Sequence, residues 1–311
     1  MALGFGLLAV SALMLLAGAE LFAENAGQAA SRLGITVFGV AFLLAGAEPE
    51  EMITAVIASA RHRPGLAAGD AIGANLTMLT LVLGAAALAR PLPFRGRVRG
   101  YAVWSALAGG AAAVTVAGGH VTRWEGGLLL AAYLAGVALL WWRERQPPAI
   151  GEVAETSEEE GNGDSRPAAV GLALAVAGVA LMAAGGWLAV GGAERVVRAL
   201  GLTDTAVGLT LLALATTAEL FALAWAAMRR GVSEIAVAGV AGSAAYNATA
   251  TLGAAALVRP LTTGGIVGPA IAAAVLPLVL LAVTTRGRLT RAAGALLVAG
   301  YIAWLSLTLT H

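Results

Sequence analysis

The sequence predicts an all-α polytopic membrane protein with ten transmembrane helices, arranged as two inverted five-helix repeats. The prediction depends on the composition, on ten long apolar runs and on an internal duplication. Of the 311 residues, 59% are hydrophobic and 12% are charged, and the mean hydropathy is +0.84. Soluble domains usually carry about 25% charged residues. A soluble globular protein is therefore excluded.

The remaining composition narrows the classes of partner. Cysteine is absent, which excludes a disulfide scaffold and thiolate metal sites. All 19 basic residues are arginines, spread over short gaps between apolar runs. Because they form no single basic patch, a nucleic-acid partner is not expected. The expected partners are the lipid bilayer and inorganic cations. No pattern in the sequence indicates a particular oligomeric state.

Ten apolar runs are each long enough to cross a bilayer, which takes roughly 20 helical residues. The first continues into Glu20, Glu24 and Asn25 and lacks a basic start, so it is interpreted as a spanning helix rather than a signal peptide. The predicted helices cover residues 3–28, 35–60, 67–89, 101–119, 125–142, 167–190, 204–228, 234–258, 263–284 and 290–309.

One polar stretch divides the chain into two halves. Residues 143–166 contain Pro147-Pro148 and an acidic run, and they are interpreted as a linker between a first repeat at 1–142 and a second at 167–311. Loops on the linker's side of the membrane hold 13 arginines and the opposite loops hold six. The positive-inside rule therefore predicts a cytoplasmic linker and two outward-facing termini in the cell membrane.

The duplication appears when the sequence is shifted against itself by 169 positions. Residues 39–92 then align with 208–261 without a gap, and 18 of the 54 positions are identical. Each copy covers two predicted helices, and five crossings separate the two starts, so the copies have opposite orientations. Inverted repeats of this kind build transporters with a binding site near the membrane midplane.

Buried charge marks the candidate site. A charged side chain at the centre of a spanning helix costs on the order of 2.5–3.5 kcal/mol, and Glu48, Glu50, Glu51 and Glu219 all lie inside predicted helices. The duplication superposes Glu50 on Glu219. Two facing carboxylates repel unless a cation or a proton lies between them, and Ca²⁺ suits such oxygen ligands. The alternative is a structural carboxyl bonded to the backbone.

Residues around the two acids add oxygen atoms. Pro49 should break its helix and free backbone carbonyls. At the mirrored place Thr216 and Thr217 offer hydroxyls, although threonines in membrane helices also bond their own backbone. Ser243 and Asn247 lie four residues apart, on one helical face, as ligands or as partners in a helix-to-helix hydrogen bond.

These segments resemble the cation/calcium antiporter superfamily, which includes Na⁺/Ca²⁺ and Ca²⁺/H⁺ exchangers. Gly-Ala-Glu-Pro-Glu-Glu at 46–51 and Ala-Thr-Thr-Ala-Glu at 215–219 are similar to its first motif. Gly-Ala-Asn at 73–75 and Gly-Ser-Ala at 242–244 are similar to its second. Ala47, Ala74 and Met78 depart from the family pattern, because none carries the usual polar group.

The resemblance implies that Glu50 and Glu219 are paired cation ligands, with Thr216, Thr217, Ser243 and Asn247 around them. If the family motif is counted from Gly46, its acid falls at Glu51 instead of Glu50. Glu51 is therefore the alternative cation ligand of the first repeat.

It also implies two five-helix repeats and that the first and sixth helices slide across the rest. The predicted function is a secondary antiporter, not an enzyme, that exchanges Ca²⁺ for Na⁺ without a cofactor. A Ca²⁺/H⁺ antiporter and an exchanger of another divalent cation, such as Mg²⁺ or Mn²⁺, are the alternatives. If the protein were instead a passive channel or a packing scaffold, replacing Glu50 and Glu219 with glutamine should leave its behaviour unchanged.

Overall fold

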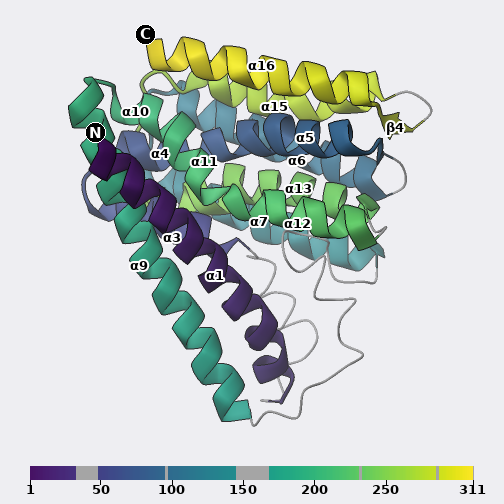
Figure 1. The fold of residues 1–311 in the computed structure, drawn as a ribbon, viewed down its shortest axis with the longest axis horizontal. Coiled ribbons are helices and arrows are strands. Elements are labelled where there is room, and N and C mark those ends of the chain that lie inside the picture. Colours follow the sequence, from purple (N-terminus) through teal and green to yellow (C-terminus); the bar gives the residue numbers. More distant parts are fainter. Residues whose placement is uncertain (33–47, 95–96, 145–167, 231–232, 285–286, 311) are drawn as a thin grey trace.

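The fold is a bundle of membrane-length helices, seen here in a computed structural model (Figure 1). The structure describes residues 1–32, 48–94, 97–144, 168–230, 233–284 and 287–310. In the first half the elements are α1 (Ala2–Arg32), α3 (Pro49–Ala60), α4 (Pro64–Leu76), η1 (Thr77–Val82), α5 (Leu83–Ala89), β1 (Leu92–Pro93), α6 (Arg97–Ala117), β2 (His120–Val121) and α7 (Arg123–Glu144).

The second half repeats this order. Its elements are α9 (Ala168–Leu200), α10 (Asp204–Val207), η2 (Gly208–Leu212), α11 (Ala213–Thr216), α12 (Ala218–Arg230), α13 (Ser233–Tyr246), η3 (Asn247–Thr251), α14 (Leu252–Val258), β3 (Leu261–Thr262), α15 (Val267–Val283), β4 (Arg288–Leu289) and α16 (Arg291–Thr310). The π-helical turns η1 and η3 fall at matching places of the duplication, one in the third helix of each repeat.

All ten predicted stretches contain helix in the described part of the chain, which confirms the predicted fold class. Seven helices are long and apolar enough to span a membrane, and Val267–Val283 is a shorter apolar helix. Residues 33–47, at the start of the second stretch, and nearly all of the predicted linker lie outside the described residues.

Several helix boundaries differ from the predicted ones, and two of the differences have a clear local cause. The sixth helix is predicted to end at 190, but α9 continues to Leu200 and ends before Gly201, whose φ of 67° is typical of a helix C-terminus. The ninth was expected from 263. Strand β3 and a turn at Gly265, with φ of 78°, delay α15 until Val267.

The repeats interlock rather than stand apart. Strand β1 pairs with β4 and β2 pairs with β3, so each two-stranded sheet takes one strand from either half. Helix α5 packs on α16, and α14 packs on α7. Both crossings are glycine contacts: a Cβ at Gly84 would lie 2.9 Å from the carbonyl oxygen of Gly294, and one at Gly253 would lie 2.6 Å from that of Gly126.

Helices α1 and α9 form a separate layer. They run side by side and obliquely across the other helices (Figure 1). Small residues allow this close approach, since a Cβ at Gly178 would lie 2.7 Å from the carbonyl oxygen of Gly18.

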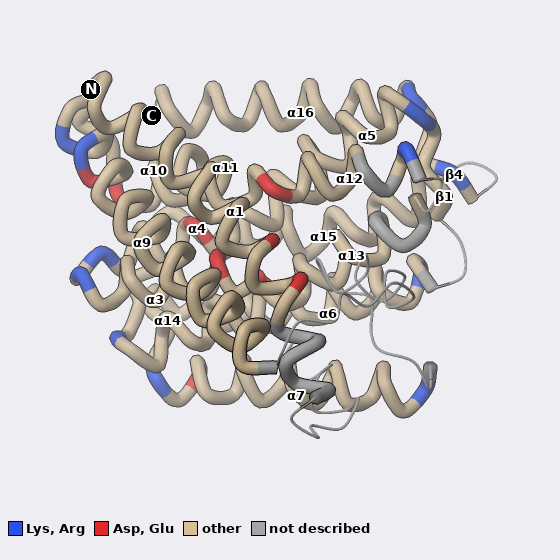
Figure 2. Tube along the Cα trace, turned by 60° about the horizontal axis from the view of Figure 1, so that its bottom comes forward, with Lys and Arg blue, Asp and Glu red and all other residues tan. Residues whose placement is uncertain are grey.

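Charge is sorted along the bundle. Arginines gather at its two ends, whereas several acidic positions lie in its middle (Figure 2). Where α3 is joined to α4, Arg61 lies 3.1 Å from Glu194 and stacks 4.5 Å above the Trp187 ring. Arg63 lies 3.5 Å from the same Glu194. These contacts tie α9 to the segment between α3 and α4.

Candidate cation site

Three acidic residues of the first repeat gather at the start of α3. Glu48 precedes the helix with a non-helical backbone (φ −128°, ψ 59°), and Pro49 is the first helical residue. Proline fits there because the first N–H of a helix has no partner to lose. Helix α3 thus begins at the proline where a break is predicted, and residues 33–47 before it lie outside the described part of the chain. Glu50 and Glu51 follow in the first turn, where the positive end of the helix dipole favours negative charge.

The second repeat has the same local structure. Helix α11 ends at Thr216, Thr217 leaves the helical conformation (φ −82°, ψ 4°), and α12 starts at Ala218. Glu219 therefore occupies the first turn of its helix, as Glu50 does. Five carboxyl side chains in the described residues are at most 2% exposed and lie in membrane-length helices or next to their breaks: Glu48, Glu50, Glu51, Asp70 and Glu219.

The two threonines differ in what they contact. The Thr217 hydroxyl donates to the carbonyl oxygen of Ala213, 2.7 Å away, in its own helix. The Thr216 hydroxyl also lies 3.1 Å from that carbonyl, but it reaches Oδ1 of Asp70 at 3.1 Å. The structure thus joins Thr216, and not the Thr217 hydroxyl, to a buried acid.

Asp70 is a site residue that sequence reasoning missed. It lies in α4 and is 1% exposed. The duplication superposes it on Gly239, so the search for matched acids could not find it. The signal that could have found it is the cost of a charge inside a spanning helix, which was applied to the glutamates but not to this aspartate.

Ser243 and Asn247 both face Glu48, as their spacing predicted. The Asn247 amide nitrogen donates to Oε2 of Glu48 at 3.3 Å, and the Ser243 hydroxyl lies beside the same carboxyl group. The Asn247 amide oxygen accepts from Thr251 at 2.9 Å. Asn247 therefore presents a donor to the acids here, whereas an oxygen ligand was predicted. A flip of the amide would reverse this, because the Thr251 hydroxyl can also accept.

Like charges dominate the electrostatics of the site. Glu51 lies within electrostatic range of Glu48, Glu50 and Asp70. At low dielectric such carboxylates repel strongly, so bound cations or protons must compensate them. No group of three or more His, Asp or Glu side chains in the described residues is already arranged as a metal centre.

Aromatic rings, also missed, adjoin the acids. Tyr246 directly precedes Asn247, is buried and lies within electrostatic range of Glu48 and Glu50. Its ring meets Tyr133 edge to face at 5.3 Å, and Tyr133 stacks on Trp104 at 5.9 Å. These three rings form a continuous row that begins beside the acids.

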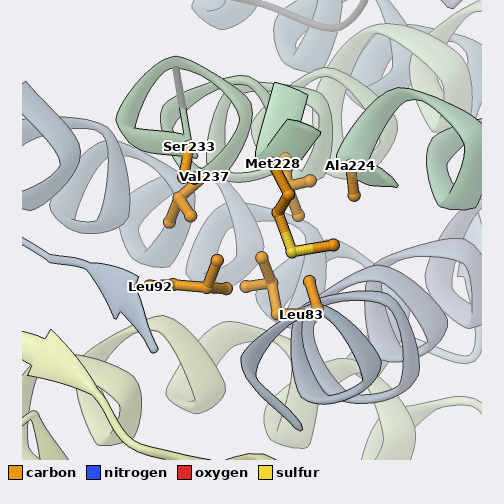
Figure 3. Close-up of a pocket in the computed structure, with 8 residues that line it drawn as sticks. Leu83, Leu92, Ala224, Met228, Ser233 and Val237 are labelled. Atoms are coloured by element: carbon orange, nitrogen blue, oxygen red, sulfur yellow. The ribbon is translucent and has the colours of Figure 1, made fainter. Parts of the chain in front are cut away.

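A pocket elsewhere in the bundle is not this site. It lies between α5, α12 and α13, with Met228 directed toward Leu83 (Figure 3). Its lining is apolar except for Ser233, and none of the five buried acids contributes to it. An apolar wall offers no oxygen ligand for a cation.

Comparison with known proteins places this geometry in a family. The family described as sodium/calcium exchanger protein matches residues 3–142 and 170–310, which is most of the chain. The chain belongs to the sodium/calcium exchanger family. This exchanger-family chain is thus a polytopic membrane protein of a family of transporters rather than enzymes.

Relatives of the exchanger-family chain include antiporter CaxA of Alkalimonas amylolytica, which is 26% identical over 81% of this chain and 79% of its own length. Inner membrane protein YrbG of Escherichia coli is 27% identical over 84% of this chain and 81% of its own. Among solved structures, the sodium-calcium exchanger NCX_Mj soaked with 2.5 mM Na⁺ and 10 mM Sr²⁺ matches with a TM-score of 0.63 and 23% identity, covering 98% of both chains. That likeness concerns the fold.

Proposed function

We propose that the protein is a secondary antiporter that exchanges Ca²⁺ for Na⁺ by alternating access at a midplane site. Glu50 and Glu219 are the paired ligands. Thr216 and Ser243 complete the site with hydroxyl oxygens, and Asn247 adds its amide oxygen once the amide is flipped away from Thr251. Thr217 shapes the break before Glu219, and Glu51 is the reserve ligand of the first repeat. Bound ions compensate the carboxylates, so Ca²⁺ and Na⁺ compete for the same charge.

The observation that carries this proposal is the matched position of the two acids. Each is buried, and each occupies the first turn of a helix, which for Glu219 follows a break between α11 and α12. Discontinuous helices whose ends point at a midplane ion are a recurring device of inverted-repeat transporters. The inverted repeat supplies two mirror-related access states, between which the α1 and α9 layer slides.

Charge counting bears on the coupling ion. Two carboxylates balance one Ca²⁺, two Na⁺ or two protons, which makes either coupling electroneutral at this pair. Five buried carboxyls exceed the charge of one divalent cation. This excess favours the second candidate, a Ca²⁺/H⁺ antiporter, because protons neutralise the surplus. Mg²⁺ or Mn²⁺ in place of Ca²⁺ is the remaining alternative.

The orientation belongs to the same proposal. The linker at 143–166 faces the cytoplasm, and both termini face outward across the cell membrane, in accord with the arginine count. Since the chain lacks cysteine, single cysteines can test it. In intact cells, an impermeant maleimide should label Thr310→Cys and spare Gly161→Cys. The reverse pattern would invert the orientation.

The function is tested in liposomes that contain the purified protein. Ca²⁺ uptake should follow an outward Na⁺ gradient in wild type and be lost in Glu50→Gln and Glu219→Gln. Glu20→Gln, the same change at an exposed acid, is the matched control and should transport normally. If a pH gradient alone drives Ca²⁺ uptake, the coupling ion is H⁺ and not Na⁺. Normal transport in both site variants would reject the antiporter site.

A further inference from the structure

The apolar pocket between α5, α12 and α13 lies outside the proposed cation site, and its place in the bundle is informative (Figure 3). Met228 lies two residues before the end of α12, Ser233 is the first residue of α13, and Leu92 begins β1, just after α5. Because these helices end or begin together, the pocket lies at one end of the bundle, close to the membrane surface.

The same place in the other repeat is closed by a hydrogen bond. The shift by 169 positions superposes Met228 on Ser59, and it superposes Ala86, which also lines the pocket, on Ala255. The Ser59 hydroxyl donates to the carbonyl oxygen of Ala255 at 2.7 Å and so ties α3 to α14. The thioether of Met228 has no proton to donate. At this point α5 and α12 meet through apolar side chains instead, and the pocket opens between them.

Positive charge adjoins the pocket. Arg229 directly follows the last lining residue of α12, Arg90 lies two residues before the lining residue of β1, and both side chains are exposed. Neither arginine forms an ion pair with an acid among the described residues. In sequence, the segments 90–99 and 229–234 together hold six arginines and one acid, Glu234. An apolar interior is thus combined with a net positive edge.

We propose that this pocket binds an anionic phospholipid, with the first part of one acyl chain between α5 and α12 and the phosphate on Arg90 and Arg229. The apolar lining suits methylene groups, and guanidinium groups bind phosphate through paired hydrogen bonds. By the predicted topology both arginines lie on the linker's side, where the leaflet carries anionic lipids. A zwitterionic lipid adds a cationic group to its phosphate, so the arginines favour a lipid of net negative charge.

Thermal unfolding of the purified full-length protein in a neutral detergent tests the site. The probe is dioleoyl phosphatidylglycerol, compared at constant ionic strength with phosphatidylcholine of the same acyl chains and with inorganic phosphate. A ligand that binds the folded state raises Tm with its concentration. Phosphatidylglycerol should do so at concentrations about tenfold lower than phosphatidylcholine, and inorganic phosphate should leave Tm unchanged. An equal response to the two lipids, or an equal shift with inorganic phosphate, would overturn the proposal.

Replacing the arginines tests the place of the phosphate. In the double variant Arg90→Gln, Arg229→Gln, the phosphatidylglycerol concentration for the half-maximal Tm shift should rise about tenfold or more. Arg259→Gln is the matched control, because Arg-Pro-Leu at 259–261 repeats Arg-Pro-Leu at 90–92 beside the closed interface. It should change that concentration by less than about threefold. Equal losses in the double variant and the control would assign the response to the whole surface and reject the site.

Filling the pocket tests the place of the acyl chain. Ala224→Leu enlarges a side chain that lines the pocket and should raise the half-maximal phosphatidylglycerol concentration about tenfold, because the leucine occupies the space of the chain. Ala131→Leu, the same change at an exposed position of α7, is the control and should respond like wild type. A wild-type response in Ala224→Leu would overturn the assignment. If Ala224→Leu does not fold, the lipid comparison and the arginine variants decide the matter.

Discussion

The two repeats share a scaffold but differ in the residues that they bring to the site. Helix starts just before a buried acid, the π-helical turns η1 and η3, and cross-repeat strand pairs occur at matching places in both. Glu50 and Glu219 are the only acids among the five buried carboxyls described above that the duplication superposes. Glu48, Glu51 and Asp70 face threonine, leucine and glycine at the mirrored positions. The repeats therefore share their helix arrangement and differ in the buried acids that they carry.

The largest effect is expected when the two matched acids, Glu50 and Glu219, are compared with the unmatched Glu48. Glu50→Gln and Glu219→Gln should each lower Ca²⁺ flux in proteoliposomes by about 100-fold or more, because removing one charged partner of a buried group costs about 2–5 kcal/mol. Glu48→Gln should cost less than tenfold, since Asn247 can donate to an amide oxygen as it does to the carboxylate. A larger loss at Glu48 than at Glu219 would make Glu48 the principal ligand of the first repeat.

The closest backbone contact gives the next effect. Gly73→Ala would force a Cβ to within 2.2 Å of the Leu209 carbonyl oxygen, so α4 and η2 must separate. Overpacking costs about 1–3 kcal/mol and sometimes more, and backbone cannot yield as a side chain can. Unfolding in detergent should show the upper end of this range. Gly110→Ala, at a helical glycine with open space, is the control and should be neutral or stabilising.

The two glycine crossings give equal, smaller effects. Gly84→Ala in α5 and Gly253→Ala in α14 should each lower the free energy of unfolding by about 1–3 kcal/mol, because both press a methyl group onto a carbonyl oxygen of the opposite repeat. Unequal losses, differing by more than about 1.4 kcal/mol or tenfold in the folding equilibrium, would show that the scaffold is less symmetric than its geometry.

The ion pairs that join the repeats at the end of the bundle give the smallest effect, because their side chains are partly exposed. The same shift by 169 positions places Asn25 opposite Glu194, and the Asn25 amide donates to Leu21 in its own helix at 2.8 Å. A double-mutant cycle with Arg61→Gln and Glu194→Gln should give a coupling energy of about 0.2–1 kcal/mol, as for other partly exposed pairs. High salt should reduce it. A coupling energy that salt leaves unchanged would assign it to packing.

The sequence predicted the features that repeat or that depend on hydrophobic length. Apolar runs located the helices, the shift by 169 positions paired Glu50 with Glu219, and Pro49 marked a helix start. The two-residue strands were not predicted, because they are too short to show a periodic pattern. The one hint was the match of Arg90-Pro91-Leu92 with Arg259-Pro260-Leu261, whose last residues begin β1 and β3. The π-helical turns carry no distinctive composition.

Residues without a counterpart in the other repeat were the hardest to predict. Asp70 was missed because its mirrored position in the second repeat holds Gly239. Tyr246 was missed because its mirrored position in the first repeat holds Thr77. The direction of the Asn247 amide depends on Thr251, one turn away, and on Glu48, nearly 200 residues earlier. Contacts this distant follow from packing, and no local pattern encodes them.

The cross-repeat strand pairs and glycine crossings bear on how such a molecule arose. Each contact that β1 and α5 make with β4 and α16 is matched by one that β3 and α14 make with β2 and α7. Two separate copies of a single ancestral half, inserted in opposite directions, would satisfy every one of these contacts as a self-complementary dimer. In a single fused chain each half no longer has to serve both roles, so Asp70 can stand in one half while Gly239 stands in the other.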